Sequence, residues 1–405
     1  MEAYLLDWAN LLVRWLHVIA AIAWIGSSFY FVWLDCNLVT PADKLREQGV
    51  DGDNWSVHGG GFYHALKYMV APQGGAIDSK LHWFYWESYW TFLSGFALFC
   101  IYYLWNASSF LVDKNILDWS GTAAGITAVA LLAGFWIVYD LICRAFGDRP
   151  GGDRIVGALV LIVVAISCWL TTHLFAGRAA FLITGAMMAT TMTLNVFFII
   201  IPGQRKVVAT MTSGQPYDAG ALAIYGKRGK QRSVHNTYFT LPVIIAMISN
   251  HYGFLYAHAQ SWLVLFAIML AGALVRQYFV ARHAFHLGRG KNPWLFAVLG
   301  IAIVAALVAW MRPAPLDAAA AASVPDTVNY AELAPVLEQR CESCHGPAVQ
   351  QKGLRFDSEA EVDKHAQDIY QQVVVTRQMP FSNATQMTDA ERALVARWYQ
   401  GLSGN

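Results

Sequence analysis

The chain has 405 residues, of which 56% are hydrophobic and only 14% are charged. Charged residues make up about a quarter of ordinary soluble domains, so this composition predicts a membrane protein. The net charge of +1 gives no reason to expect a nucleic-acid partner.

Apolar stretches of about twenty residues, long enough to cross a bilayer as a helix, recur along the chain. Eight candidate spans lie at residues 10–34, 83–105, 123–143, 155–172, 179–201, 238–256, 261–281 and 293–311. No basic region precedes the first span, which is too long for a signal-peptide core and is expected to stay as an anchor. The sequence therefore predicts an all-α fold with an eight-helix transmembrane bundle over residues 1–312, and both termini on one side.

The basic residues predict which side that is, because positively charged connections stay in the cytoplasm. Most of them follow odd-numbered spans, as Lys44 and Arg205 do, whereas the opposite side carries Lys114, Arg178 and Arg312. Both termini are therefore expected outside. In a bacterium this describes a multi-pass inner-membrane protein whose N-terminus and C-terminal segment are periplasmic.

Two inner connections, residues 35–82 and 202–237, are longer than simple turns. The first contains the run His58–His64, with three successive glycines, and the pair Gly74-Gly75. Glycines there permit sharp turns or the close approach of a ligand. The run lacks the strand, Gly-x-Gly-x-x-Gly and helix of a dinucleotide site, so no flavin or nicotinamide site is predicted.

The run Cys341-Glu342-Ser343-Cys344-His345 follows the last span. Cys-x-x-Cys-His is the attachment pattern of c-type haem, in which two thiols bind the vinyl groups and the histidine ligates the iron. The alternative is a structural zinc site or a redox pair, but no second Cys-x-x-Cys lies nearby. The pattern predicts covalent haem c on Cys341 and Cys344, with His345 as an iron ligand.

The sequence around this run completes a small cytochrome. Met379, which precedes Pro380, is the favoured second iron ligand, and Met387 is its rival. Thr388 to Glu391 predicts the N-cap and first turn of an amphipathic helix. Its apolar face carries Leu394, Val395, Trp398 and Tyr399. We expect a class I-like cytochrome c domain over residues 327–405, tethered outside by an Ala/Pro linker at 313–326.

Ionisable residues at membrane depth are costly and are functional candidates by default. His17 in the first span is predicted either to ligate a b-type haem or handle protons, or to hydrogen-bond between helices. His251 in the sixth span is expected at a similar depth, with His258 seven residues later on the same face. A second haem held by His17 and His251 is therefore a hypothesis that spacing alone does not test.

Polar residues also mark the second and fifth spans. Glu87 is the only acidic residue in its span, about a turn inside the inner boundary, and a buried carboxylate of raised pKa can act as a general base. Asn195 in the fifth span is expected to hydrogen-bond either a substrate or another helix. His235 precedes the sixth span at the inner boundary, where surface polarity is an equally good interpretation.

At this point the chain resembles a known family, the integral-membrane, cytochrome c-linked urate oxidases of bacteria. The resemblance rests on the domain order and on four runs of sequence. These runs are Trp15-Leu16-His17, Leu81-His82-Trp83-Phe84 through Trp86-Glu87, Asn195 to Gln204, and Ser249-Asn250-His251-Tyr252. It implies oxidation of urate to 5-hydroxyisourate in purine breakdown, with electrons passed to the fused haem instead of directly to dioxygen.

A planar urate anion needs an aromatic stack, hydrogen-bond donors and a base. Under the resemblance, we expect Glu87 and His82 to be catalytic and four further residues to bind urate. The four are Trp83, Trp86, Asn195 and His235. Electrons would cross a bilayer about 30 Å thick, which motivates the second haem near His17 and His251.

The expected partners are urate, the lipid bilayer and a downstream soluble cytochrome c or terminal oxidase. The alternative is a non-catalytic membrane haem protein that carries electrons from a quinol or a dehydrogenase to its cytochrome. The two functions differ in whether Glu87 is needed for turnover.

Overall fold

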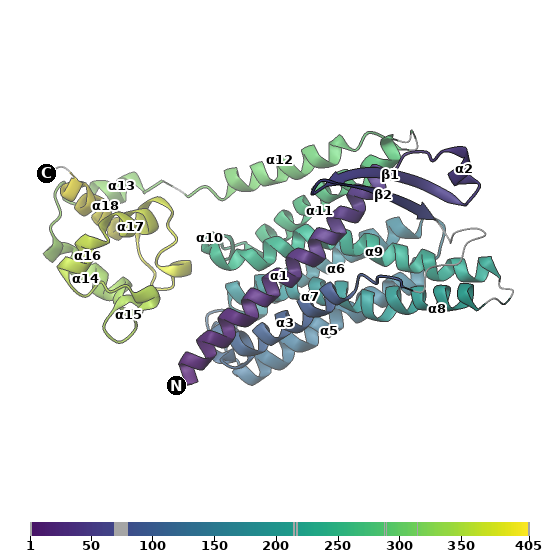
Figure 1. Ribbon diagram of the computed structural model, residues 1–405. Coiled ribbons are helices and arrows are strands. Elements are labelled where there is room, and N and C mark those ends of the chain that lie inside the picture. The colour runs from purple at the N-terminus through teal and green to yellow at the C-terminus, as the bar shows by residue number, and fades with distance from the viewer. Residues whose placement is uncertain are drawn as a thin grey trace. The chain divides into compact units, whose positions relative to one another are not determined.

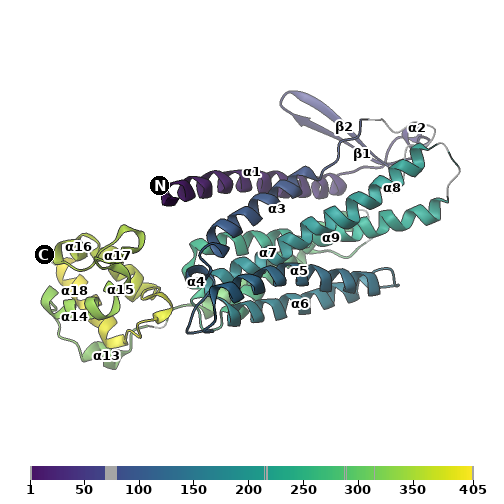
Figure 2. The same cartoon turned by 90° about the horizontal axis from the view of Figure 1, so that it is seen from below.

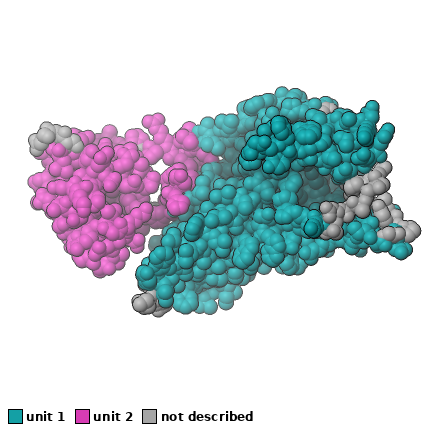
Figure 3. All heavy atoms as spheres, in the orientation of Figure 1, with its two compact units in different colours: residues 1–250, 262–305 teal, residues 251–261, 306–405 magenta. Residues whose placement is uncertain are grey.

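The computed structural model describes residues 2–68, 80–213, 215, 218–286, 288, 290–313 and 315–403. Helices dominate these residues (Figure 1). The chain divides into two compact units, one of residues 1–250 and 262–305 and the other of residues 251–261 and 306–405 (Figure 3).

The first unit contains helices at the predicted spans. Their bounds are α1 (Glu2–Cys36), α3 (Trp86–Phe99), α5 (Gly121–Phe146), α6 (Gly152–Leu174), α7 (Gly177–Asn195), α9 (Ala219–Ile248), α11 (Ser261–His286) and α12 (Trp294–Trp310), the last of which continues past residue 305. Shorter helices are α2 (Asp43–Arg46), α4 (Ala107–Phe110) and α8 (Ile201–Thr212). Turns of π-helix at Cys100–Leu104 and Val196–Ile200 continue α3 and α7.

Five helical segments among the described residues are long and apolar enough to cross a membrane. They are Tyr4–Cys36, Gly121–Phe146, Gly152–Leu174, Gly177–Thr212 and Ser261–His286. At Trp294–Trp310, α12 is apolar but shorter. These helices agree with a membrane protein, while the full eight-span bundle stays a prediction.

α7 is the most deeply buried of the long helices. In its most apolar stretch 61% of residues are buried, against 33% for α5 and for α6 and 6% for α1. Small residues explain how its neighbours come so close. A Cβ at Gly185 would lie 2.5 Å from the Cβ of Ala246 on α9, so the two helices touch there. On α7 the Thr184 hydroxyl donates to the Ala180 carbonyl of the same helix at 2.9 Å.

The connection at 35–82 contains a β-hairpin, so the all-α prediction is wrong there. β1 (Val50–His58) pairs antiparallel with β2 (Gly61–Tyr68), with Trp55 opposite His64. Gly59 and Gly60 form the turn with φ of +59° and +81°, the left-handed values that a tight hairpin requires. The glycines therefore make a chain reversal. Gly74-Gly75 lies outside the described residues.

The connection at 202–237 is mostly helical, in contrast to the predicted loop. α8 and the first half of α9 run side by side beyond the apolar stretches (Figure 2). Pro202 lies in the first turn of α8, directly after the π-helical turn that joins α8 to α7. The charged residues of this segment end the apolar stretch, but the helical backbone continues through them.

The sixth predicted span, residues 238–256, is wrong at its C-terminal end. α9 stops at Ile248 and is followed by a 3-10 turn (Ser249–His251) and α10 (Gly253–Tyr256). His251 and His258 therefore do not share one helical face.

The second unit is a small helical domain. Its helices are α13 (Ala318–Ala322), α14 (Tyr330–Arg340), α15 (Glu342–His345), α16 (Glu359–Lys364), α17 (Ala366–Tyr370) and α18 (Asp389–Ser403). 3-10 turns lie at Gln351–Gly353 and Phe381–Asn383, and a π-helical turn lies at Gln371–Val375. The predicted helix start at Thr388 is confirmed, because the Thr388 N–H donates to the Glu391 carboxylate at 2.6 Å and Glu391 N–H donates back to the Thr388 hydroxyl at 3.3 Å.

The apolar face predicted for α18 is also confirmed. Val395 and Trp398 are buried in a core with Leu333, Leu337 and Val362. Leu394 and Tyr399 pack against the same core.

The close contact between α7 and α9 yields a stability prediction. Gly185→Val should lower the unfolding free energy by about 1–3 kcal/mol, because the new side chain overpacks the contact with Ala246. Gly134→Val on α5 is the matched control, since a Cβ at Gly134 would have no other atom within 4 Å. Thermal unfolding of the two variants in one detergent measures the difference, and equal midpoints would contradict the packing argument.

Candidate functional site

A polar network lies buried where α5, α7 and α9 meet. The Asn236 amide donates to the Met192 carbonyl at 3.0 Å, which identifies its Oδ1 as the acceptor for Asn195, 3.0 Å away. The Asn195 amide nitrogen also lies 3.2 Å from the Tyr139 hydroxyl. Tyr139 in turn lies 2.8 Å from Nδ1 of His235.

These contacts determine which group donates in each of the four hydrogen bonds from Met192 to His235. Tyr139 accepts from Asn195, so its own O–H is free to donate to His235 Nδ1. In the neutral imidazole the proton then lies on Nε2. The network therefore orients His235 with an N–H donor on the ring edge away from Tyr139.

A charge pair adjoins the network. Arg232, 3% exposed, donates to Asp140 at 2.6 Å, and Arg144 donates to the other oxygen of this carboxylate at 2.5 Å. The Arg232 guanidinium also lies over the Tyr139 ring, 4.8 Å from its centroid. The buried carboxylate is thus compensated by two cations, one buried and one largely exposed. We call Tyr139, Asp140, Asn195, Arg232, His235 and Asn236 the polar network.

Two buried atoms of the polar network lack a hydrogen-bond partner among the described residues. They are Oδ1 of Asn195, an acceptor, and Nη1 of Arg232, a donor. Unpaired buried polar atoms are uncommon in folded proteins and are often completed by water or a ligand. A small polar heterocycle offers both a donor and an acceptor for such atoms.

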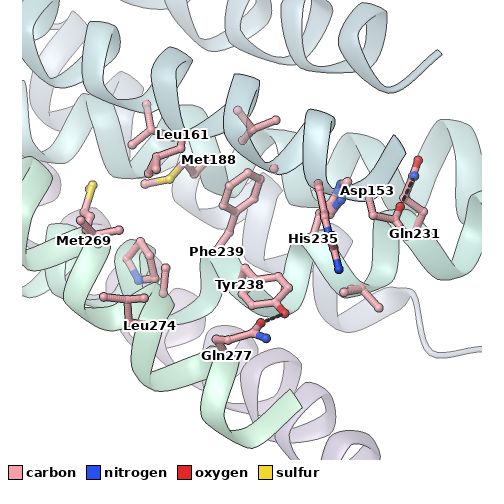
Figure 4. A pocket seen from close by; sticks show the side chains of 18 of the residues that line it. Asp153, Leu161, Met188, Gln231, His235, Tyr238, Phe239, Met269, Leu274 and Gln277 are labelled. Atoms are coloured by element: carbon pink, nitrogen blue, oxygen red, sulfur yellow. Dashed lines mark hydrogen bonds between the residues drawn. The ribbon is translucent and has the colours of Figure 1, made fainter. Parts of the chain in front are cut away.

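His235 also lines a pocket between α6, α7, α9, α11 and α12, which we call the α9 pocket. Its volume is about 760 Å³, within the usual range for small-molecule sites. In Figure 4 Asp153, Gln231 and His235 lie toward one end, and Leu161, Met188 and Met269 toward the other. The polar network therefore reaches an accessible space through His235.

The second-span residues predicted for the site lie at the start of α3. His82 and Trp86 are exposed, and Trp83 and Glu87 are half-buried. Trp83 lies under the Arg205 guanidinium, 6.0 Å from the ring centroid. The Glu87 carboxylate has no hydrogen-bond or ion-pair partner among the described residues.

α7 separates these residues from the polar network. The Thr193 hydroxyl donates to the Ser88 carbonyl on α3 at 3.4 Å, while Asn195 points to α5 and α9. Residues two positions apart in a helix, such as Thr193 and Asn195, are separated by about 200° around the helix axis. Their side chains therefore leave α7 on opposite sides. The structure thus joins Asn195 and His235, and no described hydrogen bond links either to His82, Trp83, Trp86 or Glu87.

His17 faces α3 from α1. Its Nδ1 lies 3.0 Å from the Thr91 carbonyl, which can only accept, so Nδ1 carries the proton. Nε2 is then the nitrogen that is free to ligate iron. Gly95 makes room for the ring, since a Cβ there would lie 2.8 Å from His17 Cε1. His251 is exposed and belongs to the other unit, so their pairing stays a prediction.

The haem-attachment residues lie on one tight turn of the second unit. The N–H groups of Cys344 and His345 both donate to the Cys341 carbonyl, at 3.1 and 2.9 Å. Both thiols are free, and burial raises the pKa of the Cys341 thiol to about 12. Burial lowers the pKa of His345, so its imidazole is neutral near pH 7, the form that ligates iron.

These features fit a covalent haem. Two reduced thiols lie one turn apart beside a neutral histidine, whose ring centroid is 4.9 Å from that of Phe356. Among the described residues, no group of three or more His, Cys, Asp or Glu is arranged to hold a metal ion.

The two candidate methionines differ in environment. Met387 is 4% exposed and packs in the core of the unit, whereas Met379 is 36% exposed. Arg392 holds the Met379 segment, since its Nη1 donates to the Met379 carbonyl at 2.8 Å and to the Val373 carbonyl at 2.5 Å. The Met379 side chain is therefore more accessible than that of Met387, and Met379 stays the predicted second ligand.

Sequence reasoning gave no site role to Tyr139 or Arg232 and treated Asp140 as a weak candidate near an inner end. It placed Asn236 beside His235 at the inner boundary, where surface polarity was the interpretation. The available signal was spacing: Arg232, His235 and Asn236 fall three and four residues apart and so share a helical face. Tyr139 carried no signal, because a tyrosine near the end of an apolar helix is usually interfacial.

The paired arginines on Asp140 allow an internal comparison. Arg232→Met should destabilise the protein by about 3–5 kcal/mol, because it removes the buried partner of a buried carboxylate. Arg144→Met removes a largely exposed partner of the same carboxylate and should change stability by about 0–1 kcal/mol. Thermal unfolding in detergent measures both, and equal losses would show that the burial of Arg232 is immaterial.

Arg392 offers a test of how Met379 is held. Arg392→Met removes the donor to the Val373 and Met379 carbonyls and should destabilise the second unit by about 1–3 kcal/mol. In haem-loaded protein it should also weaken the methionine-to-iron absorption band. Arg397→Met on the same helix, whose partner Asp326 is exposed, is the control. An unchanged band in Arg392→Met would remove its assigned positioning role.

Comparison with known proteins provides one match. A family model described as "Urate oxidase N-terminal" matches residues 3–312. No curated protein and no solved structure matches the chain.

Proposed function

The chain belongs to the urate oxidase N-terminal family, and we propose on that basis that it oxidises urate to 5-hydroxyisourate and passes the electrons to a c-type haem in its own second unit. Membership of the family implies an oxidoreductase with a urate-related function. The finer steps below are our proposal.

The proposal rests on the observation that one chain combines a family match with a turn that fits covalent haem. Residues 3–312 match the family, and Cys341, Cys344 and His345 lie beyond that match on a turn that fits covalent haem. A haem on that turn would accept electrons one at a time. An electron acceptor held on the same chain makes direct transfer to dioxygen unnecessary.

The reaction requires water, a base and donors. Urate gains one oxygen atom from water and loses two electrons and two protons overall. In this proposal Glu87 takes a proton, and its carboxylate is available because no described residue pairs with it. His82 assists it, while the Trp83 and Trp86 rings stack on the planar substrate.

Asn195 and His235 hold the polar edge of the substrate. Asn195 has a free acceptor oxygen, and the Tyr139 hydrogen bond leaves His235 with an Nε2–H donor. Because α7 lies between this pair and Glu87, the proposal requires α3 to move before one urate molecule contacts both groups.

The membrane arrangement extends the same proposal. Eight spans in a bacterial inner membrane place the N-terminus and the haem unit in the periplasm, and a soluble cytochrome c or terminal oxidase takes the electrons onward. His17 and His251 are the candidate ligands of a membrane haem b. The tautomer of His17, with Nε2 unprotonated, suits that role.

The same observation at His17 supports a second candidate function, a membrane haem protein that carries electrons from a quinol or dehydrogenase without oxidising urate. In that case the polar network would be structural.

Anaerobic addition of urate separates the two functions. Urate added to oxidised, haem-loaded protein should raise the reduced α-band of the c-type haem. Glu87→Gln should abolish this reduction, because an amide cannot accept the proton, while dithionite still reduces the haem. Glu47→Gln, an exposed acid of the same unit, is the control and should leave the rate unchanged. Failure of urate, with reduction by a quinol retained, would overturn the proposal in favour of the carrier.

A further inference from the structure

The α9 pocket is long and has two chemically different ends. Along α9 its wall runs from Lys227 to Pro242, a rise of about 22 Å at 1.5 Å per residue. Such a length matches an extended chain lying parallel to the helices. A compact polar molecule would fill only one end.

The end near the start of α6 is basic. Arg154, Lys227 and Lys230 line it together with a single carboxylate, Asp153, which accepts from Gln231 at 2.7 Å. Lys230 also forms an ion pair with the Asp35 carboxylate at 3.3 Å, so three cations are balanced by two carboxylates and an excess of positive charge remains.

These cations keep most of their hydrogen-bonding capacity. The Arg154 guanidinium has no partner among the described residues. Lys227 makes one contact of 3.5 Å with the Asp148 carbonyl, and Lys230 makes one of 3.3 Å with Asp35. A lysine has three donors and an arginine five, so an anion bearing several oxygens can be bound here.

The remainder of the pocket is apolar. Val164, Met188, Phe239, Phe266, Met269 and Leu270 form its walls. Figure 4 shows Met188, Leu161 and Met269 gathered away from Asp153 and Gln231. A hydrocarbon chain is stabilised there because its apolar surface is kept away from water.

We propose that the α9 pocket binds one anionic phospholipid, with its phosphate at Arg154, Lys227 and Lys230 and an acyl chain along α6, α9 and α11. Basic pockets between membrane helices are known to suit anionic lipid head groups. Urate or free phosphate would leave the apolar length empty, and an uncharged quinone would leave the cations unmatched. The site shares one residue with the proposed urate site, His235, which lines the pocket.

Through His235, a lipid in the α9 pocket would also affect the polar network. Its ring lines the pocket and its Nδ1 accepts from Tyr139. An acyl chain in the pocket covers the His235 ring and separates the network from water, which strengthens its hydrogen bonds.

The test uses full-length, haem-loaded protein stripped of lipid in detergent. Added phosphatidylglycerol should raise the thermal unfolding midpoint by several degrees and give a one-to-one adduct in native mass spectrometry. Phosphatidylcholine, inorganic phosphate and a short-tailed ubiquinone should each give a much smaller shift. An equal shift with any one of them would overturn the proposal.

Variants locate the site. The double variant Arg154→Gln/Lys227→Gln should reduce the phosphatidylglycerol shift at least threefold, and Val164→Trp should do the same by filling the chain slot. Lys114→Gln, an exposed cation that does not line the pocket, is the control and should keep the full shift. A full shift in both pocket variants would show that the lipid binds elsewhere.

Discussion

Polar side chains between apolar helices must find their hydrogen-bond partners inside the protein, and α7 is where this requirement shapes the structure most. Asn195 is fully buried, and its amide donates to residues on both α5 and α9. Rotation of any of the three helices would break these bonds at a cost of about 1–3 kcal/mol for each unsatisfied group. Gly185 adds a steric requirement, because α9 approaches α7 too closely for a side chain. Together they determine which faces meet.

The chemistry available to the first unit follows from that arrangement. Tyr139, held by Asn195, sets the tautomer of His235, and His235 presents its other edge to the α9 pocket. Arg232 compensates Asp140 and also lies over the Tyr139 ring. A ligand in the pocket and a ligand at the network would therefore act on one shared histidine. In the second unit Arg392 has a comparable role, because its guanidinium donates hydrogen bonds to the Val373 and Met379 carbonyls.

The elements that sequence reasoning predicted well are those whose signal is local. The capping pair Thr388 and Glu391 is a contact between residues three apart, so it can be predicted without knowledge of the tertiary structure. The long apolar helices depend only on length and composition. The hairpin at 50–68 was not predicted, because the connection at 35–82 was interpreted only through its length and its glycines. The helices within 202–237 were not predicted, because this connection was defined only as the residues between two apolar spans.

The sequence by itself determined the class of protein, the two parts of the chain and the turn that suits a haem, because composition, apolar length and the spacing of Cys341, Cys344 and His345 act within a few residues. Only the tertiary structure decided which polar residues meet. It joined Asn195 and His235 through Tyr139, which no pattern had marked, and it placed Glu87 on the other side of α7. The physical reason is that the facing of a helix depends on contacts with residues far away in the chain. Spacing along one helix shows which residues share a face, but it does not show what that face touches.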